Sequence, residues 1–186
     1  MNLTKDDKRV MLIIARRAVE NNLGIGEPIK IDTFNFPILK ERCGAFVTLT
    51  KNRQLRGCIG YILSNDFLYE TIHDAAIQAS SRDPRFSPVK KNELKDIKLE
   101  ISLLSVPFKM NSYDDIIVGT HGLIVSENGR RGLLLPQVPI EHNMDKDEYL
   151  SSLCLKAGLS PNLWKEKVLN IEMFTATVFN EEELGI

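Results

Sequence analysis

The chain has 186 residues, of which 43% are hydrophobic and 26% are charged, and its formal net charge is −1. This length suits one good-sized domain or two small lobes that share a core, which we take as a single domain over residues 1–186, and the composition excludes a disordered chain. The near-neutral charge argues against a general nucleic-acid binder, because such proteins usually carry a basic surplus. No segment is apolar over the roughly 18 residues needed to cross a bilayer, so we expect no membrane role.

The first 22 residues predict an amphipathic helix. Thr4 is a suitable N-cap, Asp7 stands at the capping-box position, and Gly24 marks the expected end. The segment is charged throughout and lacks the layout of a signal peptide. The chain also has an odd number of cysteines, so we expect reduced thiols and a cytoplasmic location. The cysteines are Cys43, Cys58 and Cys154.

No sequence pattern points to a bound cofactor. There is no CxxC pair and no His/Cys cluster with ligand spacing, so we predict no metal site. The glycines form neither a GxGxxG nor a Walker pattern, so we predict no nucleotide cofactor.

The rest of the chain repeats one pattern. The stretch "CGAFVTLTKNRQLRGCIGYI" matches "HGLIVSENGRRGLLLPQV", since each has a strand, a polar turn, Arg-Gly and a second strand. Helical spacing follows in "FLYETIHDAAIQAS" and "DEYLSSLCLKAGLS", and a third strand follows in "IKLEISLLSV" and "LNIEMFTATV". Four segments in the same order predict an internal duplication, with repeats at about 42–106 and 121–179.

The repeat predicts the fold class. One strand–strand–helix–strand unit is marginally stable alone, whereas two can bury a shared core. We therefore expect an α+β fold, with mainly antiparallel sheet and helices packed on it.

Residues present in only one repeat are the better functional candidates. Gly57 and Gly132 match and are expected to serve the backbone, whereas Cys58 stands opposite Leu133 in the alignment. Cys58 is either a small buried residue or a thiol activated by a nearby positive charge. Because alternate residues of a strand share a face, Arg56 is expected beside Cys58, where it would favour the thiolate.

The two glycines around Cys58 sharpen that alternative. Gly57 and Gly60 leave little side-chain cover on either side of it, which often marks a close approach by another segment or by a ligand. An approach by protein predicts a buried, inert thiol, whereas an approach by a ligand predicts an accessible one.

The loop "RDPRF" also occurs in the first repeat alone. One interpretation is a helix-terminating turn in which an arginine pairs with Asp83. The other is an anion site in which guanidinium groups, among them that of Arg85, hold a carboxylate or phosphate. In both cases we expect an ordered loop against "LRGCIG", with Phe86 in the core. The charge run "VKKNELKD" that follows has the character of a solvated face.

His121 opens the second repeat, where the first has Cys43. It is either a structural hydrogen-bonding residue or, if the pseudo-symmetry brings it close to Cys58, the base of a Cys–His pair.

"LRGCIG" together with "RDPRF", "HGLIV" and "LLLPQV" resembles the AMMECR1 family, from about Val10 to Phe179. The resemblance implies an α+β protein of two unequal lobes with a cleft between them, and no established activity. Prokaryotic members are often encoded beside a radical SAM protein and a Memo-like protein, which implies a protein partner from a shared pathway. The positions that match the family motifs are 55–60, 83–86, Gly122, Leu135 and Pro136.

Two departures from the family bear on its site. His121 matches some members, but others have a different residue before Gly122, which weakens a Cys–His mechanism as a rule of the family. Many members carry Gly-Trp-Asp after "LPQV", whereas this chain has "IEHNMDKDE". If that tryptophan lines the cleft elsewhere, the site here is altered.

Three functions compete on these observations. The first is a binding or adaptor module whose "LRGCIG" surface docks a protein partner or a small anionic ligand. The alternative is a thiol-dependent enzyme with Cys58 as nucleophile, His121 as base, and the side chains of Arg56, Asp83 and Arg85 at the ligand. Nucleic-acid binding through a local arginine patch is disfavoured by the net charge. Whether the protein is an enzyme stays open at this point.

Overall fold

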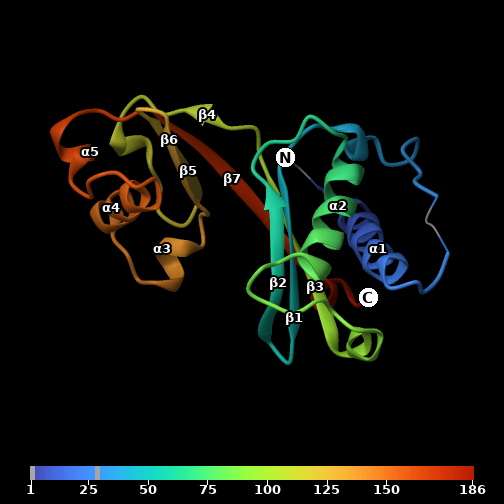
Figure 1. The fold of residues 1–186 in the computed structure, drawn as a ribbon. Helices are drawn as coiled ribbons and strands as arrows, with labels where there is room; N and C mark the ends of the chain where they lie inside the picture. The colour runs from blue at the N-terminus through green and yellow to red at the C-terminus, as the bar shows by residue number, and fades with distance from the viewer. Residues whose placement is uncertain (1–2, 28–29) are drawn as a thin grey trace. The chain divides into compact units, whose positions relative to one another are not determined.

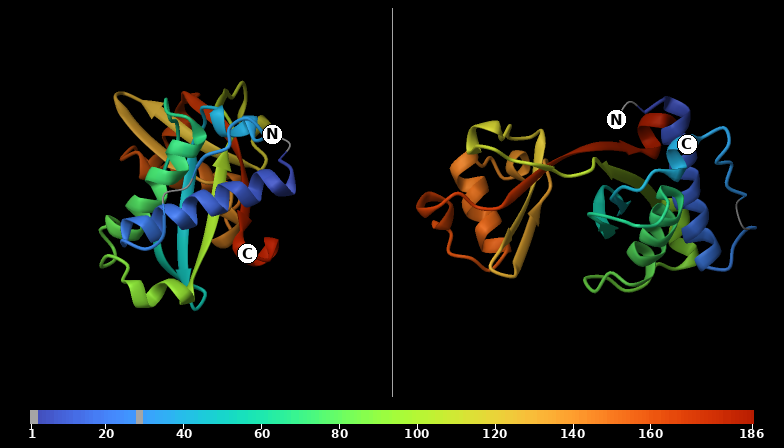
Figure 2. Two further views of the ribbon diagram at one scale, coloured as in Figure 1. Left: turned by 90° about the vertical axis from the view of Figure 1, so that its right-hand side faces the viewer. Right: turned by 90° about the horizontal axis from the view of Figure 1, so that it is seen from above.

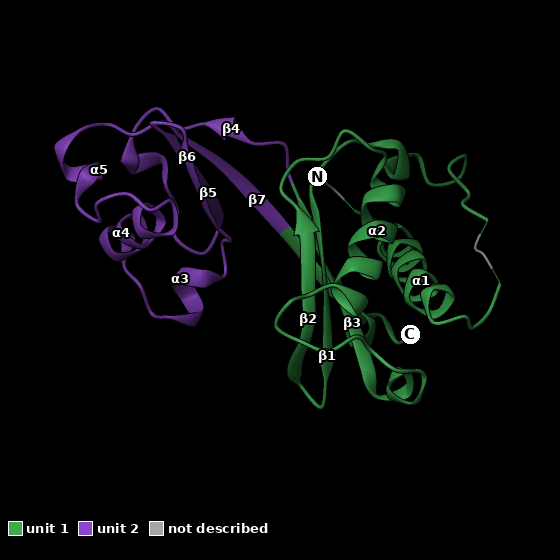
Figure 3. Ribbon diagram, viewed as in Figure 1, with its two compact units in different colours: residues 1–104, 177–186 green, residues 105–176 purple. Residues whose placement is uncertain are grey.

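The computed structural model describes residues 3–27 and 30–186. The chain forms two compact units, of which unit 1 contains residues 1–104 and 177–186 and unit 2 contains residues 105–176 (Figure 3). Helices pack on antiparallel strands in both units, so the predicted α+β class is confirmed. No helix among the described residues is both long enough and apolar enough to cross a membrane.

Unit 1 has a three-stranded sheet in the order β2-β1-β3. Helices α1 and α2 pack against each other and cover one face of this sheet (Figure 1, Figure 2). Short helices complete the unit. Its elements are α1 (Lys5–Asn22), β1 (Ala45–Lys51), β2 (Gln54–Tyr61), α2 (Leu68–Ser81), β3 (Ile97–Leu104), α6 (Glu181–Leu184) and the 3-10 helices η1 (Pro37–Lys40) and η2 (Lys91–Asp96).

The core of unit 1 follows from strand alternation. Ala45, Val47 and Leu49 of β1 point to the helices and are fully buried, whereas the residues between them are only partly buried. Helix α1 begins as predicted, since the Thr4 side chain accepts from the Asp7 amide at 3.1 Å and the Asp7 carboxylate accepts from the Thr4 amide at 2.9 Å. The side chains of Phe46 and Thr48, which alternate with the buried residues of β1, point to the opposite face of the sheet.

Unit 2 repeats the arrangement with other residues. Its strands are ordered β4-β7-β5-β6 and are antiparallel, and the last residues of β7 belong to unit 1. Leu123 and Val125 of β5 pack with Leu150 and Leu153 of α4 in the core. Its elements are β4 (Phe108–Lys109), β5 (His121–Glu127), β6 (Arg130–Leu134), α3 (Val138–Glu141), α4 (Lys146–Lys156), α5 (Leu163–Glu166), β7 (Ile171–Asn180) and the 3-10 helix η3 (Tyr113–Asp115).

The three long strands and the main helix between them come in the same order in the two parts of the chain. Unit 1 has β1, β2, α2 and β3. The chain from β5 to the end of β7, residues 121–180, has β5, β6, α4 and β7. In each, the first strand pairs with both the second and the third. The duplication predicted from the sequence rests on this order and stays a prediction about the origin of the fold.

Candidate functional site

The backbone of Cys58 is held from outside the sheet. Strand β2 lies at one end of the unit 1 strand order, and an edge strand leaves N–H and C=O groups unpaired. The Cys58 amide donates to Asp83 Oδ2 at 2.9 Å, and Arg85 Nη2 donates to the Cys58 carbonyl at 3.3 Å. The "RDPRF" loop therefore packs against "LRGCIG" and pairs with the β2 edge where a neighbouring strand would.

Asp83 and Arg85 form one charged unit within that loop. Arg85 Nε donates to Asp83 Oδ1 at 2.9 Å and Nη2 donates to Oδ2 at 2.7 Å. The Asp83 side chain is 2% exposed. The Arg85 guanidinium first, and then the Cys58 amide, hold the pKa of Asp83 well below its usual range, so the carboxylate stays ionised. The fork of Arg85 thus binds an internal carboxylate, as in the turn interpretation of the loop.

A β-bulge sets the direction of Arg56. Leu49 is opposite Gly57 while Thr50 is opposite Leu55, so Arg56 is the extra residue on β2. The bulge interrupts the alternation from which Arg56 was expected beside Cys58. The arginine close to Cys58 is instead Arg85, whose pKa is raised by Asp83 first and also by Cys58.

Arg56 is bound by Glu93. Its Nε and Nη2 donate to the two carboxylate oxygens at 3.2 and 3.1 Å, and Nη1 donates to the Ser87 carbonyl at 2.8 Å. Lys51 Nζ adds a bond to Glu93 at 3.1 Å. Arg56 first, then the Lys90 amide and Lys51, lower the pKa of Glu93 to about 2. The charge run "VKKNELKD" was expected to be a solvated face. Its Glu93 side chain, however, is only 16% exposed and pairs with both Arg56 and Lys51.

The Cys58 side chain lies on the face away from α2. Thr48 is directly opposite it on β1, and Thr48 Oγ1 donates to Cys58 Sγ at 3.3 Å. A Cβ at Gly57 would overlap the Ala79 carbonyl oxygen, so the close approach at Gly57 is by α2. The inference that a protein approach buries Cys58 was wrong, because residues 57 and 58 point to opposite faces. Cys58 is partly exposed, whereas Cys43 and Cys154 are buried.

The other motif glycines leave room for aromatic rings. Gly60 is opposite Phe46, and a Cβ at Gly60 would overlap the ring and backbone of that residue. Gly122 is opposite Phe174 in unit 2, and a Cβ there would overlap the Phe174 ring. Both glycines therefore serve packing between neighbouring strands.

Phe86 is not in the core, which corrects the expectation for the loop. It is half-buried, its ring centroid lies 5.4 Å from the Arg85 guanidinium carbon, and Val89 is the buried apolar residue of this segment. The hydrogen bonds of Asp83 anchor the loop, so an apolar anchor is not needed. Phe86 instead lines a hollow of about 420 Å³, together with Lys51, Arg56, Ser87, Lys90, Asn92 and Glu93.

His121 lies in unit 2 and makes local contacts. Its Nδ1 accepts from the Ile117 amide at 3.2 Å, and its ring meets Phe108 edge-on at a centroid distance of 5.8 Å. With Nδ1 as the acceptor of this bond, the ring tautomer is the one with its N–H at Nε2, and the Nδ1 lone pair is occupied by the Ile117 amide. A pair with Cys58 of unit 1 stays a prediction.

The chemical capacity of the site follows from these contacts. Three of the predicted residues, Cys58, Asp83 and Arg85, contact one another, whereas Arg56 is held by Glu93 and by the Ser87 carbonyl. Among residues 3–27 and 30–186, no group of three or more His, Cys, Asp or Glu side chains could hold a metal ion. Glu93 and Thr48 belong to the site but were not predicted from the sequence. A search for an acidic partner of Arg56 elsewhere in the chain is the signal that could have indicated Glu93.

Comparison with known proteins covers nearly the whole chain. The AMMECR1 family model matches residues 12–179. Protein Mbar_A1807 of Methanosarcina barkeri is 41% identical over 97% of this chain and 93% of its own length, and protein MJ0810 of Methanocaldococcus jannaschii is 40% identical over 97% and 93%. The crystal structure of the uncharacterised protein PH0010 from Pyrococcus horikoshii is similar, with a TM-score of 0.85 and 37% identity over 97% of this chain and 94% of that one. This chain belongs to the AMMECR1 family.

Proposed function

We propose that this protein is a binding module that recognises an anionic group of its ligand in the hollow beside "LRGCIG". One observation carries the proposal: Arg56 of "LRGCIG" and Phe86 of "RDPRF", which are 30 positions apart in the sequence, line the same hollow of about 420 Å³. A volume near the lower end of the small-ligand range, about 300–1,000 Å³, suits a compact group.

The charge of the hollow favours an anion. Lys51, Arg56 and Lys90 contribute three positive charges against the single negative charge of Glu93. Glu93 is shared by Lys51 and Arg56, so the hollow keeps a positive excess. A carboxylate or phosphate entering it would meet guanidinium and ammonium donors beside the Phe86 ring.

The frame around the hollow supports binding without large rearrangement. Arg56 is fixed by Glu93 and Ser87, and the loop that carries Phe86 is fixed to β2 through Asp83. A site whose groups are held before binding loses less conformational entropy when the ligand arrives. An acidic segment on a protein from the radical SAM or Memo-like pathway would suit this surface, and that partner is part of the proposal.

Titration of the ¹⁵N-labelled full chain tests the proposal with two probes, inorganic phosphate and a hexaglutamate peptide. We expect shifts at the amides of Ser87, Lys90 and Asn92, and their loss in Lys90→Glu. Lys5→Glu is the matched control, because it changes the charge equally at the start of α1 and should leave the shifts intact. Shifts from phosphate alone indicate a small anion, and shifts from the peptide alone indicate an acidic segment. The proposal fails if neither probe shifts these amides, or if Lys90→Glu responds as the unmodified chain does.

A thiol-dependent enzyme is the second candidate, and the positioned thiol of Cys58 favours it. Its backbone is fixed by Asp83 and Arg85 and its sulfur contacts Thr48, so the nucleophile would need little ordering. The His121 tautomer described above counts against that residue as its base. An alkylation rate at pH 7 above that of free cysteine would favour the enzyme, and a rate at or below it would favour the binding module.

A further inference from the structure

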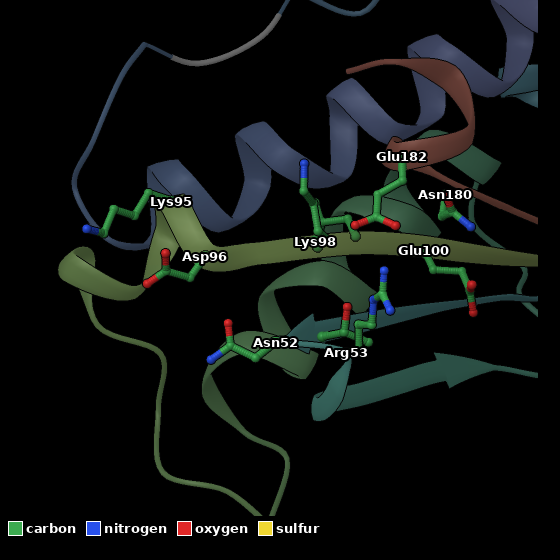
Figure 4. A pocket seen from close by; sticks show the side chains of 10 residues that line it. Asn52, Arg53, Lys95, Asp96, Lys98, Glu100, Asn180 and Glu182 are labelled. Carbon is green, nitrogen blue, oxygen red and sulfur yellow. The ribbon is translucent and has the colours of Figure 1, made fainter.

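A second hollow lies on unit 1, away from the motif loop. It has a volume of about 410 Å³ and opens between the β1–β2 turn, β3 and α6. Figure 4 shows the side chains of Arg53 from the turn, Lys98 and Glu100 from β3, and Glu182 from α6 around it. All of these elements belong to unit 1.

Charged side chains of both signs line this hollow. The cations are Arg53, Lys95 and Lys98, and the anions are Asp96, Glu100 and Glu182. Within the part of the chain that the structure describes, the side chains of Arg53, Lys98 and Glu182 form no ion pair and no hydrogen bond. This differs from the first hollow, where Glu93 binds both Lys51 and Arg56.

Arg53 occupies a backbone position that suits glycine. Asn52 and Arg53 have φ values of 52° and 63°, and the matching turn of unit 2 has Asn128 and Gly129 at 51° and 74°. Such two-residue hairpin turns favour Asn-Gly, because both residues need a positive φ, which asparagine tolerates and glycine adopts most easily. Unit 1 thus carries an arginine where a glycine would fit with less strain, and its side chain lines the hollow.

We propose that this hollow binds a small zwitterion with a carboxylate and an ammonium group, the class of free α-amino acids. The carboxylate would lie against Arg53 and Lys98, and the ammonium group against Glu182. The Asn180 amide and the Thr50 hydroxyl, which also line the hollow, would supply hydrogen bonds. A ligand of one sign would leave either Glu182 or the cations Arg53 and Lys98 without a counter-charge, so these three side chains favour a molecule that carries both charges. The proposal is independent of the anion hollow.

The first experiment uses the ¹⁵N-labelled full chain and a panel of single L-amino acids at millimolar concentration. We expect at least one of them to shift the amides of Thr50, Lys98 and Asn180. Its N-acetyl derivative, which lacks the ammonium group, and its methyl ester, which lacks the carboxylate, should shift them far less. The proposal is overturned if no amino acid shifts these amides, or if either derivative acts as well as the parent.

The variant Arg53→Gly separates binding from folding. We expect an unchanged or higher Tm, because glycine adopts the positive φ without strain, and an affinity at least tenfold lower for the amino acid that binds. Lys40→Ala is the control, since it removes a positive charge from η1 and should bind as the unmodified chain does. Unchanged affinity in Arg53→Gly would overturn the assignment of the carboxylate to Arg53.

Discussion

In each unit a glycine on the second strand of the hairpin lies against an alanine near the end of the following helix. Gly57 meets Ala79 in unit 1, and Gly132 meets Ala157 in unit 2. The residues next to this common contact differ between the two units. Unit 1 has Cys58 after its glycine, with Asp83 and Arg85 holding the strand edge, whereas unit 2 has Leu133.

The edge of the second strand is also held differently. In unit 2 the strand itself supplies the contact, because Arg130 of β6 donates to the Gly158 carbonyl after α4. In unit 1 the loop supplies it, through a carboxylate and a guanidinium that bind both backbone groups of one residue. The glycine contact is therefore common to the two units, whereas the charged loop belongs to unit 1 alone and fixes the backbone of Cys58.

The largest loss of stability is expected when Gly57 or Gly132 is replaced by alanine. Gly57→Ala should cost about 3 kcal/mol of unfolding free energy, because its Cβ would overlap a backbone carbonyl of α2. Gly132→Ala should cost about 1 to 2 kcal/mol, because its Cβ would lie 2.7 Å from the Ala157 amide nitrogen and 2.9 Å from its Cβ.

Two probes can follow these variants separately. Trp164 is the single tryptophan and lies in unit 2, so its fluorescence reports on that unit, and hydrogen exchange of β1 amides reports on unit 1. Equal costs, or a larger cost for Gly132→Ala, would contradict the tighter contact that the structure gives unit 1.

Removing the Asp83 charge should have the next largest effect. Asp83→Asn is expected to lower the unfolding free energy by about 2 kcal/mol near pH 6, because the Arg85 guanidinium and the Cys58 amide lose a charged acceptor. Asp114→Asn is the control, since that side chain is 98% exposed and should change stability little. Urea denaturation followed by circular dichroism measures both variants.

The same pair predicts a pH dependence. The pKa of Asp83 is lowered in the folded state, so its stabilisation is complete above the unfolded pKa of about 3.9 and is lost as the pH falls toward the folded value. The difference between the unmodified chain and Asp83→Asn should therefore shrink between about pH 5 and pH 2. A difference that stays constant over this range would show that the charge of Asp83 does not stabilise the loop.

Exchanging Arg53 and Gly129 tests the contrast between the hairpin turns of the two units, of which one has an arginine and the other a glycine at the second position. Arg53→Gly should stabilise the chain by about 1 kcal/mol, and Gly129→Arg should destabilise it by a similar amount, because only glycine adopts the positive φ at little cost. No atom of the described residues lies within 4 Å of a Cβ built at Gly129, so its replacement measures strain without a clash. Thermal unfolding of the two variants suffices, and shifts in the same direction would refute the equivalence of the two turns.

Local patterns predicted most of the frame. The capping box of α1, both hairpins and the helix after each hairpin follow from residues close together in sequence, and the structure has all of them. Gly158 follows the Ala157 C-cap of α4 with a φ of 70°, the left-handed conformation in which glycine often ends a helix. These features depend on contacts within about one turn or one hairpin, which a sequence displays directly.

The site was less predictable because its contacts are long-range or alter a local rule. Arg56 pairs with Glu93, 37 residues away, and nothing in "VKKNELKD" distinguishes that glutamate from a solvated one. A bulge at Arg56 changed the strand alternation, so the arginine near Cys58 is Arg85. Phe86 was assigned to the core from its hydrophobicity, but the Asp83 hydrogen bonds already anchor that loop.

Unit 1 holds Cys58 by its backbone and leaves this residue partly exposed, with its side chain on the face away from α2. Alkylation of the native chain with iodoacetamide, followed by peptide mass spectrometry, compares it with two internal controls. We expect modification of Cys58 while Cys43 and Cys154, which are buried, react only after unfolding. A Cys58 that stays unmodified until the other two react would contradict the claim.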